Sequence, residues 1–254
     1  MASPAQLKTT GLLLLVSFFA VLFAIFMPLF PGTAGGKVNG LDYLDNFFNQ
    51  LSKSSAFYIK DQQKKAEAFK GEAFDMTLKL KNEKFKVKDP NTQELKEVEL
   101  PATVQAEAAA KVFAAHGVKT SVETDTVKIS GNDFGGMLAT ILDDAVLLYN
   151  NQGDALQAKY GIDARLAFYS FYQTLAVMEK DQTKKEKFDR AKFIKGVSTK
   201  AIEPAYNYYQ VEATPVKEEM VLLIAALAFY VIYTMWYGFG LLYLFEGLGI
   251  KLDH

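Results

Sequence analysis

Two long, uncharged apolar runs constrain this chain most strongly, one near each end of the sequence. The first extends from Gly11 to Phe30 and the second from Met220 to Phe245. A helix that crosses about 30 Å of hydrocarbon needs about 20 apolar residues, because it rises about 1.5 Å per residue and must pair its own backbone groups. Both runs reach that length. We therefore predict transmembrane helices over residues 11–30 and 219–246.

The first run has an alternative interpretation as a cleaved secretory signal. Lys8 would supply its basic start, and the small residues Gly32-Thr33-Ala34 would supply a cleavage site. The apolar part of a secretory signal usually spans only about 7–15 residues, and this run is longer. We expect the run to be retained as a membrane anchor.

Two spans would place both ends of the chain on the same side of the bilayer. Lys8 precedes the first span and no acidic residue lies in the first ten positions, which favours a cytoplasmic N-terminus. We predict cytoplasmic segments at residues 1–10 and 247–254, with an extracytoplasmic domain over residues 31–218. The predicted location is a bacterial inner (plasma) membrane, with the domain in the periplasm.

The pattern of residues 31–218 predicts an α+β domain with a small antiparallel sheet and several helices. A division near residue 153 is the second choice. The expected order begins with an amphipathic helix at 41–58 that continues as an exposed helix through 60–70, followed by paired strands at 74–80 and 94–100 joined by a turn at Asp89-Pro90-Asn91. A helix from Pro101 to Gly117 and strands at 118–123 and 126–131 come next. The remaining helices run from Asn132 to Gly153, then to about Lys180, and finally toward Pro204.

Composition excludes several chemistries. Residues 31–218 hold equal numbers of basic and acidic residues, so the segment has no net charge with which to neutralise nucleic-acid phosphates. The chain has no cysteine, which removes disulfides and thiolate catalysis. Its two histidines, His116 and His254, are too few and too far apart to predict a zinc or haem site. We predict no catalytic residue, no metal, no cofactor and no nucleic-acid partner.

Several residues in the middle segment resemble functional groups but have simpler explanations. His116 is expected at the C-terminal end of a helix, where a cation is favourable. Asp143 and Asp144, with Asp133 ten residues before Asp143, could form a carboxylate cluster, but helical geometry predicts that they lie on a solvated face. Residues 131–136 lack the spacing of a phosphate-binding loop and predict a turn with a helix cap.

The second apolar run carries hydroxyl groups near its midpoint. Tyr230, Tyr233, Thr234 and Tyr237 project within about one third of the helix circumference. A hydroxyl without a partner in hydrocarbon is costly, so we expect this stripe to face protein, a cofactor or water.

The first apolar run offers a surface for close helix packing. Ser17, Ala20 and Ala24 are small residues at a spacing that lets another helix approach. Three occupants stay open: the second span of the same chain, a larger membrane protein, or a quinone, haem or lipid pocket.

Two aromatic groups in the middle segment are candidates for either core packing or partner docking. They comprise Phe168, Tyr169, Phe171 and Tyr172 in the first group and Tyr206, Tyr208 and Tyr209 in the second.

These features together predict a double-anchored integral membrane protein that is a non-catalytic accessory or scaffold subunit. The partners would be the lipid bilayer and a larger membrane complex or a homo-oligomer. Residues 247–254 are too short for a cytoplasmic output domain, and two spans without internal charge give no ion path. The alternative is an extracytoplasmic ligand-binding or sensing domain that reports to a membrane partner. An enzyme with a carboxylate-based site is third.

Overall fold

The computed structural model describes residues 2–32, 36–88 and 95–250. The chain divides into two compact units, which are described separately. The terminal unit comprises Met1–Ser55 with Glu212–His254, and the central unit comprises Ala56–Val211. Three predicted features fall outside the described residues: part of the cleavage site at 32–34, the turn at 89–91 and His254. The boundaries of the extracytoplasmic domain, placed at residues 31 and 218, stay a prediction.

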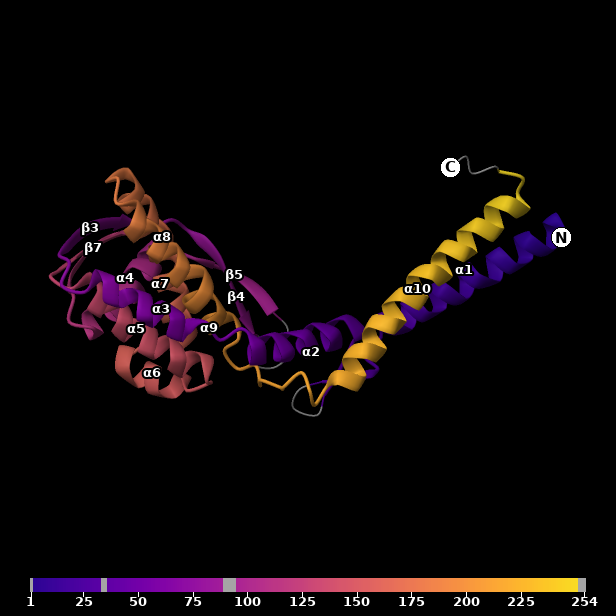
Figure 1. Cartoon of the computed structure of the whole chain (residues 1–254), viewed down its shortest axis with the longest axis horizontal. Coiled ribbons are helices and arrows are strands. Elements are labelled where there is room, and N and C mark those ends of the chain that lie inside the picture. Colours follow the sequence, from indigo (N-terminus) through magenta and orange to yellow (C-terminus); the bar gives the residue numbers. More distant parts are fainter. Residues whose placement is uncertain (1, 33–35, 89–94, 251–254) are drawn as a thin grey trace. The chain divides into compact units, whose positions relative to one another are not determined.

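Two long apolar helices form most of the terminal unit. Helix α1 spans Pro4–Phe26 and α10 spans Met220–Gly247, and both are long and apolar enough to cross a membrane. Helix α1 begins earlier than predicted because Ser3 caps it. It ends at Phe26 because the residue before a proline, here Met27 before Pro28, disfavours helical geometry. The two helices run side by side (Figure 1).

Glycines bring the backbones of α1 and α10 into direct contact. A side chain on Gly11 would lie 2.4 Å from the backbone nitrogen of Leu244. A side chain on Gly247 would lie 2.4 Å from the backbone nitrogen of Lys8. Since Lys8 precedes Gly11 while Gly247 follows Leu244, the two helices are antiparallel. Small residues permit this close approach between apolar helices.

The rest of the terminal unit is a short hairpin and one amphipathic helix. The hairpin pairs β1 (Phe30–Pro31) with β2 (Lys37–Val38). Helix α2 spans Gly40–Ser55, and the Asn39 side chain caps it by accepting from the Asp42 backbone at 2.9 Å. The helix buries Phe47 and Leu51.

The helix expected to continue from α2 is a separate element in the central unit. Helix α3 spans Ile59–Ala66 and is followed by a short 3₁₀ turn, Glu67–Phe69. The predicted helix is present in α3 and the 3₁₀ turn and most of its residues are exposed, but Gln62 and Ala66, together with the preceding Ile59, are buried. Three buried residues at spacings of three and four are enough to attach a helix whose other positions are charged.

The central sheet has three antiparallel strands in the order β3, β7, β6. Strand β3 is Phe74–Lys79, β6 is Lys119–Glu123 and β7 is Thr126–Gly131. The predicted strands at 118–123 and 126–131 are confirmed. The mixed α+β class with small antiparallel sheets is confirmed as well.

The predicted pairing of residues 74–80 with 94–100 was wrong. Strand β3 pairs with β7, while β5 (Leu95–Leu100) pairs with β4 (Glu83–Lys88) in a separate hairpin. Strand β4 was not predicted. Alternation identifies a strand but not its partner, and β3 buries Phe74, Met76 and Leu78 in a core that only the folded chain assembles.

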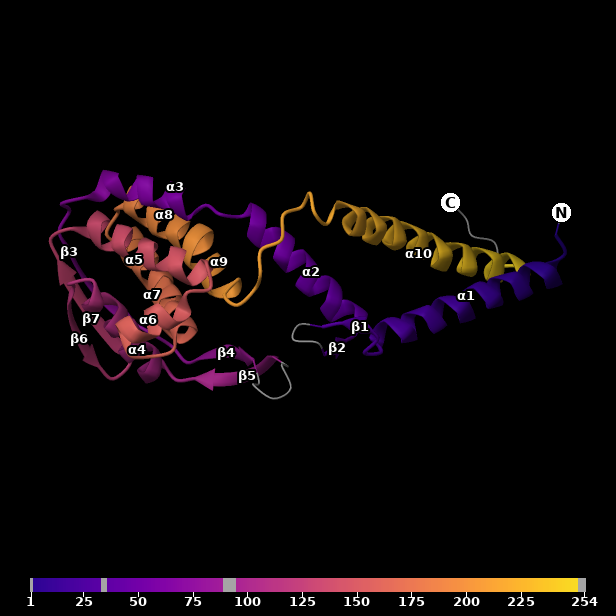
Figure 2. The ribbon, with the colours of Figure 1, turned by 90° about the horizontal axis from the view of Figure 1, so that it is seen from below.

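Helices cover one face of the central sheet. Helices α4 and α7 contact the strands directly, and Figure 2 shows the helices gathered on that side. The helices are α4 (Ala102–Ala115), α5 (Phe134–Tyr149), α6 (Gly153–Tyr160), α7 (Ala164–Lys184), α8 (Phe188–Val197), a π-helical turn (Ser198–Ile202) and α9 (Glu203–Asn207). The helix from Pro101 to Gly117 is confirmed.

The segment predicted as one helix up to Lys180 is two helices. Gly161 ends α6 with a left-handed backbone at φ 67°, a conformation that glycine adopts without strain. Asp163 then caps α7 by accepting from the backbone of Leu166 at 2.8 Å. Gly153, expected to break the preceding helix, begins α6, and α5 ends at Tyr149.

The glycine contact in the helix pair generates a stability prediction. Gly11→Ala should destabilise the pair by about 1–3 kcal/mol, because the added carbon collides with backbone that cannot rotate away. Trp236 is the only tryptophan and lies on α10 with its indole nitrogen buried, so its fluorescence reports on the pair during denaturation. Gly238→Ala is the matched control, since nothing lies within 4 Å of its added carbon. Equal stability of the two variants would contradict the packing argument.

Candidate functional site

The helix pair satisfies one member of the predicted hydroxyl stripe. The hydroxyl of Tyr233 donates to the Phe18 carbonyl of α1 at 3.1 Å, and the two rings stack at 4.2 Å. Tyr233 therefore has its hydrogen-bond partner within the chain, as expected for a polar group in an apolar helix pair.

The other members of the stripe do not act together. Thr234 donates to the Tyr230 carbonyl of its own helix at 2.8 Å. The Tyr237 ring lies 5.0 Å from that of Phe18 and is 41% exposed. Tyr230 is 70% exposed. Among the described residues, neither Tyr230 nor Tyr237 has a hydrogen-bond partner for its hydroxyl, but the Tyr237 ring packs against Phe18 of α1 whereas Tyr230 is the more exposed of the two.

Of the small residues of α1, Ala20 lies opposite α10 and is exposed, while Ser17 and Ala24 lie on the flank of the contact and are half-buried. Gly11 and Phe18 contact α10. At about 100° per residue, Ala20 lies about 160° around the helix from Phe18, and Ala24 and Ser17 lie about 100–120° from Phe18 on one side. The Ser17 hydroxyl donates to the Leu13 carbonyl at 2.8 Å. Glycines, not this stripe, mediate the internal pairing.

The two aromatic groups contribute mainly to the core of the central unit. Phe168 and Phe171 are fully buried. Tyr169, Tyr172 and Tyr206 are half-buried and contact one another. Burial, followed by the nearby Tyr172 and Glu203, raises the pKa of Tyr206.

The remaining two tyrosines of these groups are also half-buried. The Tyr208 ring contacts the ring of Tyr149 at 6.0 Å, and the Tyr209 ring covers Gly153. Their possible role as a partner interface stays a prediction.

A buried polar cluster joins α4, α5 and α6, and the sequence analysis missed it. The Asp144 carboxylate accepts hydrogen bonds from His116 Nε2 at 2.9 Å, Lys159 Nζ at 2.6 Å and the Tyr160 hydroxyl. The prediction that Asp144 is solvated was wrong, because its side chain is only 6% exposed. Lys159 and Tyr160 are distant from His116 in sequence, so only folding assembles the cluster.

His116 has the predicted position but not only the predicted contacts. It follows the last residue of α4, as expected. Its ring crosses to α5, where Nδ1 lies 2.9 Å from the Thr140 hydroxyl. The His116 side chain is 3% exposed, and none of the described pockets is lined by the cluster. We therefore interpret this cluster as a cross-link between helices.

The cluster shifts the pKa values of Asp144 and Tyr160 in opposite directions. Burial acts to raise the pKa of Asp144, but hydrogen bonds from His116, Lys159 and Tyr160 outweigh it and hold that pKa below its usual value. Burial, reinforced by the Asp144 carboxylate, raises the pKa of Tyr160 well above the usual range.

The other two aspartates of the proposed cluster are separate. Asp133 caps α5 and accepts from the backbone of Gly136 at 2.8 Å and of Gly71 at 2.9 Å, which lowers its pKa. Asp143 accepts from Gln63 Nε2 at 2.7 Å. Within the described ranges, no group of acidic or histidine side chains is arranged to hold a metal.

An open pocket in the central unit brings together basic side chains that the overall neutrality conceals. It occupies about 750 Å³ between β3 and the turn from α7 to α8, and we call it the basic pocket. Three of its four cationic side chains, Lys185, Lys187 and Arg190, come from residues 180–200. That segment holds eight basic and three acidic residues. Its lining comprises Ala73, Phe74, Asp75, Gly117, Lys119, Ser130, Gly131, Asn132, Gln182, Lys185, Lys187 and Arg190.

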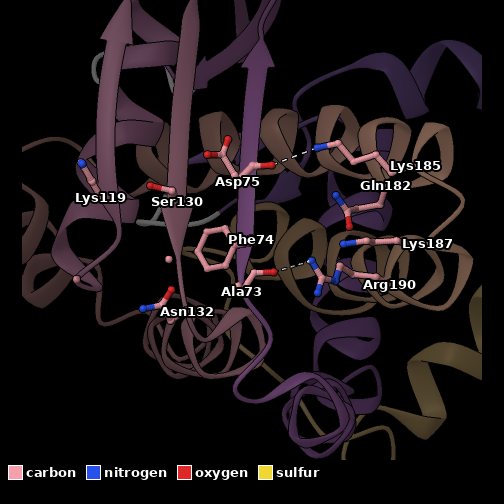
Figure 3. Close-up of a pocket in the computed structure, with 12 residues that line it drawn as sticks. Ala73, Phe74, Asp75, Lys119, Ser130, Asn132, Gln182, Lys185, Lys187 and Arg190 are labelled. Atoms are coloured by element: carbon pink, nitrogen blue, oxygen red, sulfur yellow. Dashed lines mark hydrogen bonds between the residues drawn. The ribbon is translucent and has the colours of Figure 1, made fainter.

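Two of the basic side chains hold the free edge of β3. Lys185 donates to the Asp75 carbonyl at 3.1 Å, and Arg190 donates to the Ala73 carbonyl at 3.4 Å (Figure 3). Arg190 also pairs with Glu72, and its guanidinium lies 4.7 Å from the centre of the Phe134 ring. These contacts position the turn beside the strand.

Two other lysines of the basic pocket, Lys119 and Lys187, are unpaired in the described part of the chain. Figure 3 shows Lys187 extending from the turn toward β3, with Lys119 beyond the strands on the other side. Gln182 is 1% exposed, and its Oε1 has no partner among the described atoms. A hollow with unpaired cations and an unsatisfied buried acceptor is suited to binding a polar ligand.

Basic residues also line a second hollow, of about 890 Å³, between α3 and α8. Its lining includes the rings of Phe69 and Phe193, which stack with their centres 4.7 Å apart, and both charge signs: Lys65, Lys192, Lys195 and Lys200 with Glu72 and Asp189. Positive charge thus gathers along α8.

Comparison with known protein families, with curated proteins and with solved structures finds no match for this chain.

The buried cluster generates a prediction for stability and pH. Asp144→Asn should destabilise the central unit by about 3 kcal/mol at pH 7, because the substitution removes the charged acceptor shared by the buried His116 and Tyr160 and by the partly exposed Lys159. Asp143→Asn, on the exposed neighbour, should change stability by only about 0.5 kcal/mol. Hydrogen exchange of peptides from α4, α5 and α6 in the full chain measures both effects.

The same variants give a pH signature. The folded pKa of Asp144 lies below its unfolded value of about 3.9, so its contribution is complete above that value and is lost as the pH falls through the folded pKa. The difference between the native protein and Asp144→Asn should therefore shrink below about pH 4. A constant difference down to low pH would contradict the assignment.

Proposed function

We propose that this chain is a non-catalytic accessory or scaffold subunit of a larger membrane complex, with the α1 and α10 pair crossing the bilayer and docking against a partner. The observation that carries this proposal is Tyr230. Its hydroxyl is exposed near the middle of α10, while the neighbouring Tyr233 already has a partner on α1.

The depth of Tyr230 supports a protein partner over lipid. It lies about 4 Å from the centre of the apolar run 220–245, at about 1.5 Å per residue. The hydrocarbon boundary is about 15 Å from the centre, beyond the reach of a tyrosine side chain. A hydroxyl held in hydrocarbon without a partner is unfavourable. A polar group on another membrane helix would satisfy it.

The small face of α1 fits the same interpretation. Ser17, Ala20 and Ala24 are turned away from the centre of the contact with α10, so the internal pair does not use their capacity for close packing. A second helix can approach α1 on this side. The pair would then be covered by a partner at two places, near Ala20 and near Tyr230.

The antiparallel pairing supports the predicted topology. Lys8 of α1 lies beside Gly247 of α10, so both outer ends meet at the same end of the pair. We propose that these ends are cytoplasmic and that the central unit is extracytoplasmic, in the periplasm of a bacterial inner membrane. The close contact at Gly11 also favours retention of α1 over its removal as a signal.

Site-specific photo-crosslinking tests the docking proposal. A benzophenone amino acid at Ala20 or at Tyr230 should yield an adduct with a larger membrane protein in native membranes. The same probe at Leu15, which lies against Gly240 inside the pair, should react with α10 of the same chain. Adducts only with lipid from Ala20 and Tyr230 would reject a protein partner. Adducts only between copies of this chain would favour a homo-oligomer instead.

Cysteine labelling tests the topology directly, because the native chain has no cysteine. Ser3→Cys introduces a single exposed thiol just before the start of α1, and Lys180→Cys introduces one in the central unit. A membrane-impermeant maleimide added outside intact cells should label Lys180→Cys alone. Labelling of both positions or of Ser3→Cys alone would overturn the proposed arrangement.

The basic pocket favours a second candidate function. A central unit with a polar hollow of about 750 Å³ is compatible with an extracytoplasmic ligand-binding or sensing domain that reports to a membrane partner. This candidate does not require the docking of the helix pair.

A further inference from the structure

We propose that the basic pocket binds a polyol phosphate, a small phosphate ester that also carries hydroxyl groups. This inference rests on the second candidate function, ligand binding by the central unit, and is independent of partner docking by α1 and α10.

The charge of the basic pocket selects an anion. Four cationic side chains line it, and Asp75 is the only acidic residue in its lining. Lys185 and Arg190 are engaged with β3 and with acidic residues. Lys119 and Lys187 have no ion pair within the described chain, so their charges are available to a ligand.

The strand register places Lys119 on the same face of the sheet as Asp75 and Ser130, while Lys187 reaches the basic pocket from the opposite side, beside β3. Asp75, Ser130 and Lys119 are directly opposite one another on β3, β7 and β6, so their side chains lie on one face of the sheet. Lys187 extends toward these strands from the turn after α7 (Figure 3). A phosphate in the basic pocket would meet positive charge from two elements.

The acceptors in the basic pocket require donors on the same ligand. Oε1 of Gln182 is buried without a partner, while its Nε2 donates to Asp181 at 2.8 Å. A buried acceptor left unsatisfied is costly, so a donor is expected there. The exposed Asp75 carboxylate is a second acceptor on the pocket surface. Hydroxyl groups beside a phosphate would supply both, whereas inorganic phosphate alone would serve only the lysines.

Glycerol phosphate combines these features in the smallest form. The same chemistry occurs in free polyol phosphates and in the headgroup of phosphatidylglycerol, so the ligand has two possible sources. Both present a phosphate and hydroxyl donors a few atoms apart. The experiment must separate the chemistry from its source.

Calorimetric titration of the full chain in a neutral detergent tests the chemistry. The probe is sn-glycerol 3-phosphate, with glycerol and inorganic phosphate as partial ligands. We expect saturable binding with a dissociation constant near or below about 1 mM. Inorganic phosphate should bind more weakly and glycerol should not bind measurably. Added salt should weaken the binding, because the lysines are exposed.

Variants assign the binding to the basic pocket. Lys119→Gln and Lys187→Gln should each weaken the affinity about threefold, and the double variant about tenfold. Lys180→Gln is the matched control, since Lys180 is exposed on the same basic segment but does not line the basic pocket. Gln182→Met removes the buried acceptor at nearly constant volume. It should reduce the preference for glycerol phosphate over inorganic phosphate while leaving inorganic phosphate binding unchanged.

Nanodiscs distinguish the two sources. The full chain is placed in phosphatidylcholine alone or in phosphatidylcholine with phosphatidylglycerol, and the soluble probe is titrated into each. Loss of probe binding in the second lipid, seen equally in the native protein and in the Lys180→Gln control, identifies a lipid headgroup as the occupant. Equal binding in both identifies a free polyol phosphate.

Three results would overturn the proposal. The first is no saturable binding of glycerol phosphate up to about 10 mM. The second is equal binding by the native protein and the double lysine variant. The third is equal affinity for inorganic phosphate and glycerol phosphate in the native protein. None of these results affects crosslinking from Ala20 or Tyr230, so failure here and failure of the docking proposal are separately visible.

Discussion

The direct backbone contact between α1 and α10 is the constraint on which the terminal unit depends. Because Gly11 and Gly247 have no side chains, the helices approach closely enough for Tyr233 to reach the Phe18 carbonyl. That bond uses one hydroxyl of the stripe and leaves Tyr230 outside the pair. The same contact sets the antiparallel direction, which places both outer ends together. The proposed docking face and topology therefore derive from one packing feature.

The central unit depends on polar groups that join elements distant in sequence. Asp144 accepts from residues after α4 and at the end of α6, so loss of its charge affects three helices together. Lys185 and Arg190 cover the free edge of β3, where an uncovered strand would be open to pairing with another chain. Covering that edge brings the basic segment 180–200 against the sheet. The basic pocket results from this arrangement.

The parts of the fold that were predicted correctly have local signals. Pro101 and Gly117 mark the ends of α4, and alternation marks β6 and β7. The errors concern partners. The partner of β3 is β7, about fifty residues away, and alternation carries no information about that choice. The Asp144 cluster and the basic pocket were missed for the same reason, since each combines side chains from separate elements. An uneven charge distribution in residues 180–200 was the available signal for the basic pocket.

The two apolar helices, the mixed α+β class and the absence of cysteine chemistry are readable from the sequence alone, because each follows from composition or from a local repeat. Folding selects the glycines that bring α1 and α10 together, the tyrosine whose hydroxyl is satisfied by α1 and the lysines that line one hollow. These outcomes depend on distances between residues far apart in the chain. Such distances are set by packing of the whole unit, which no local pattern encodes.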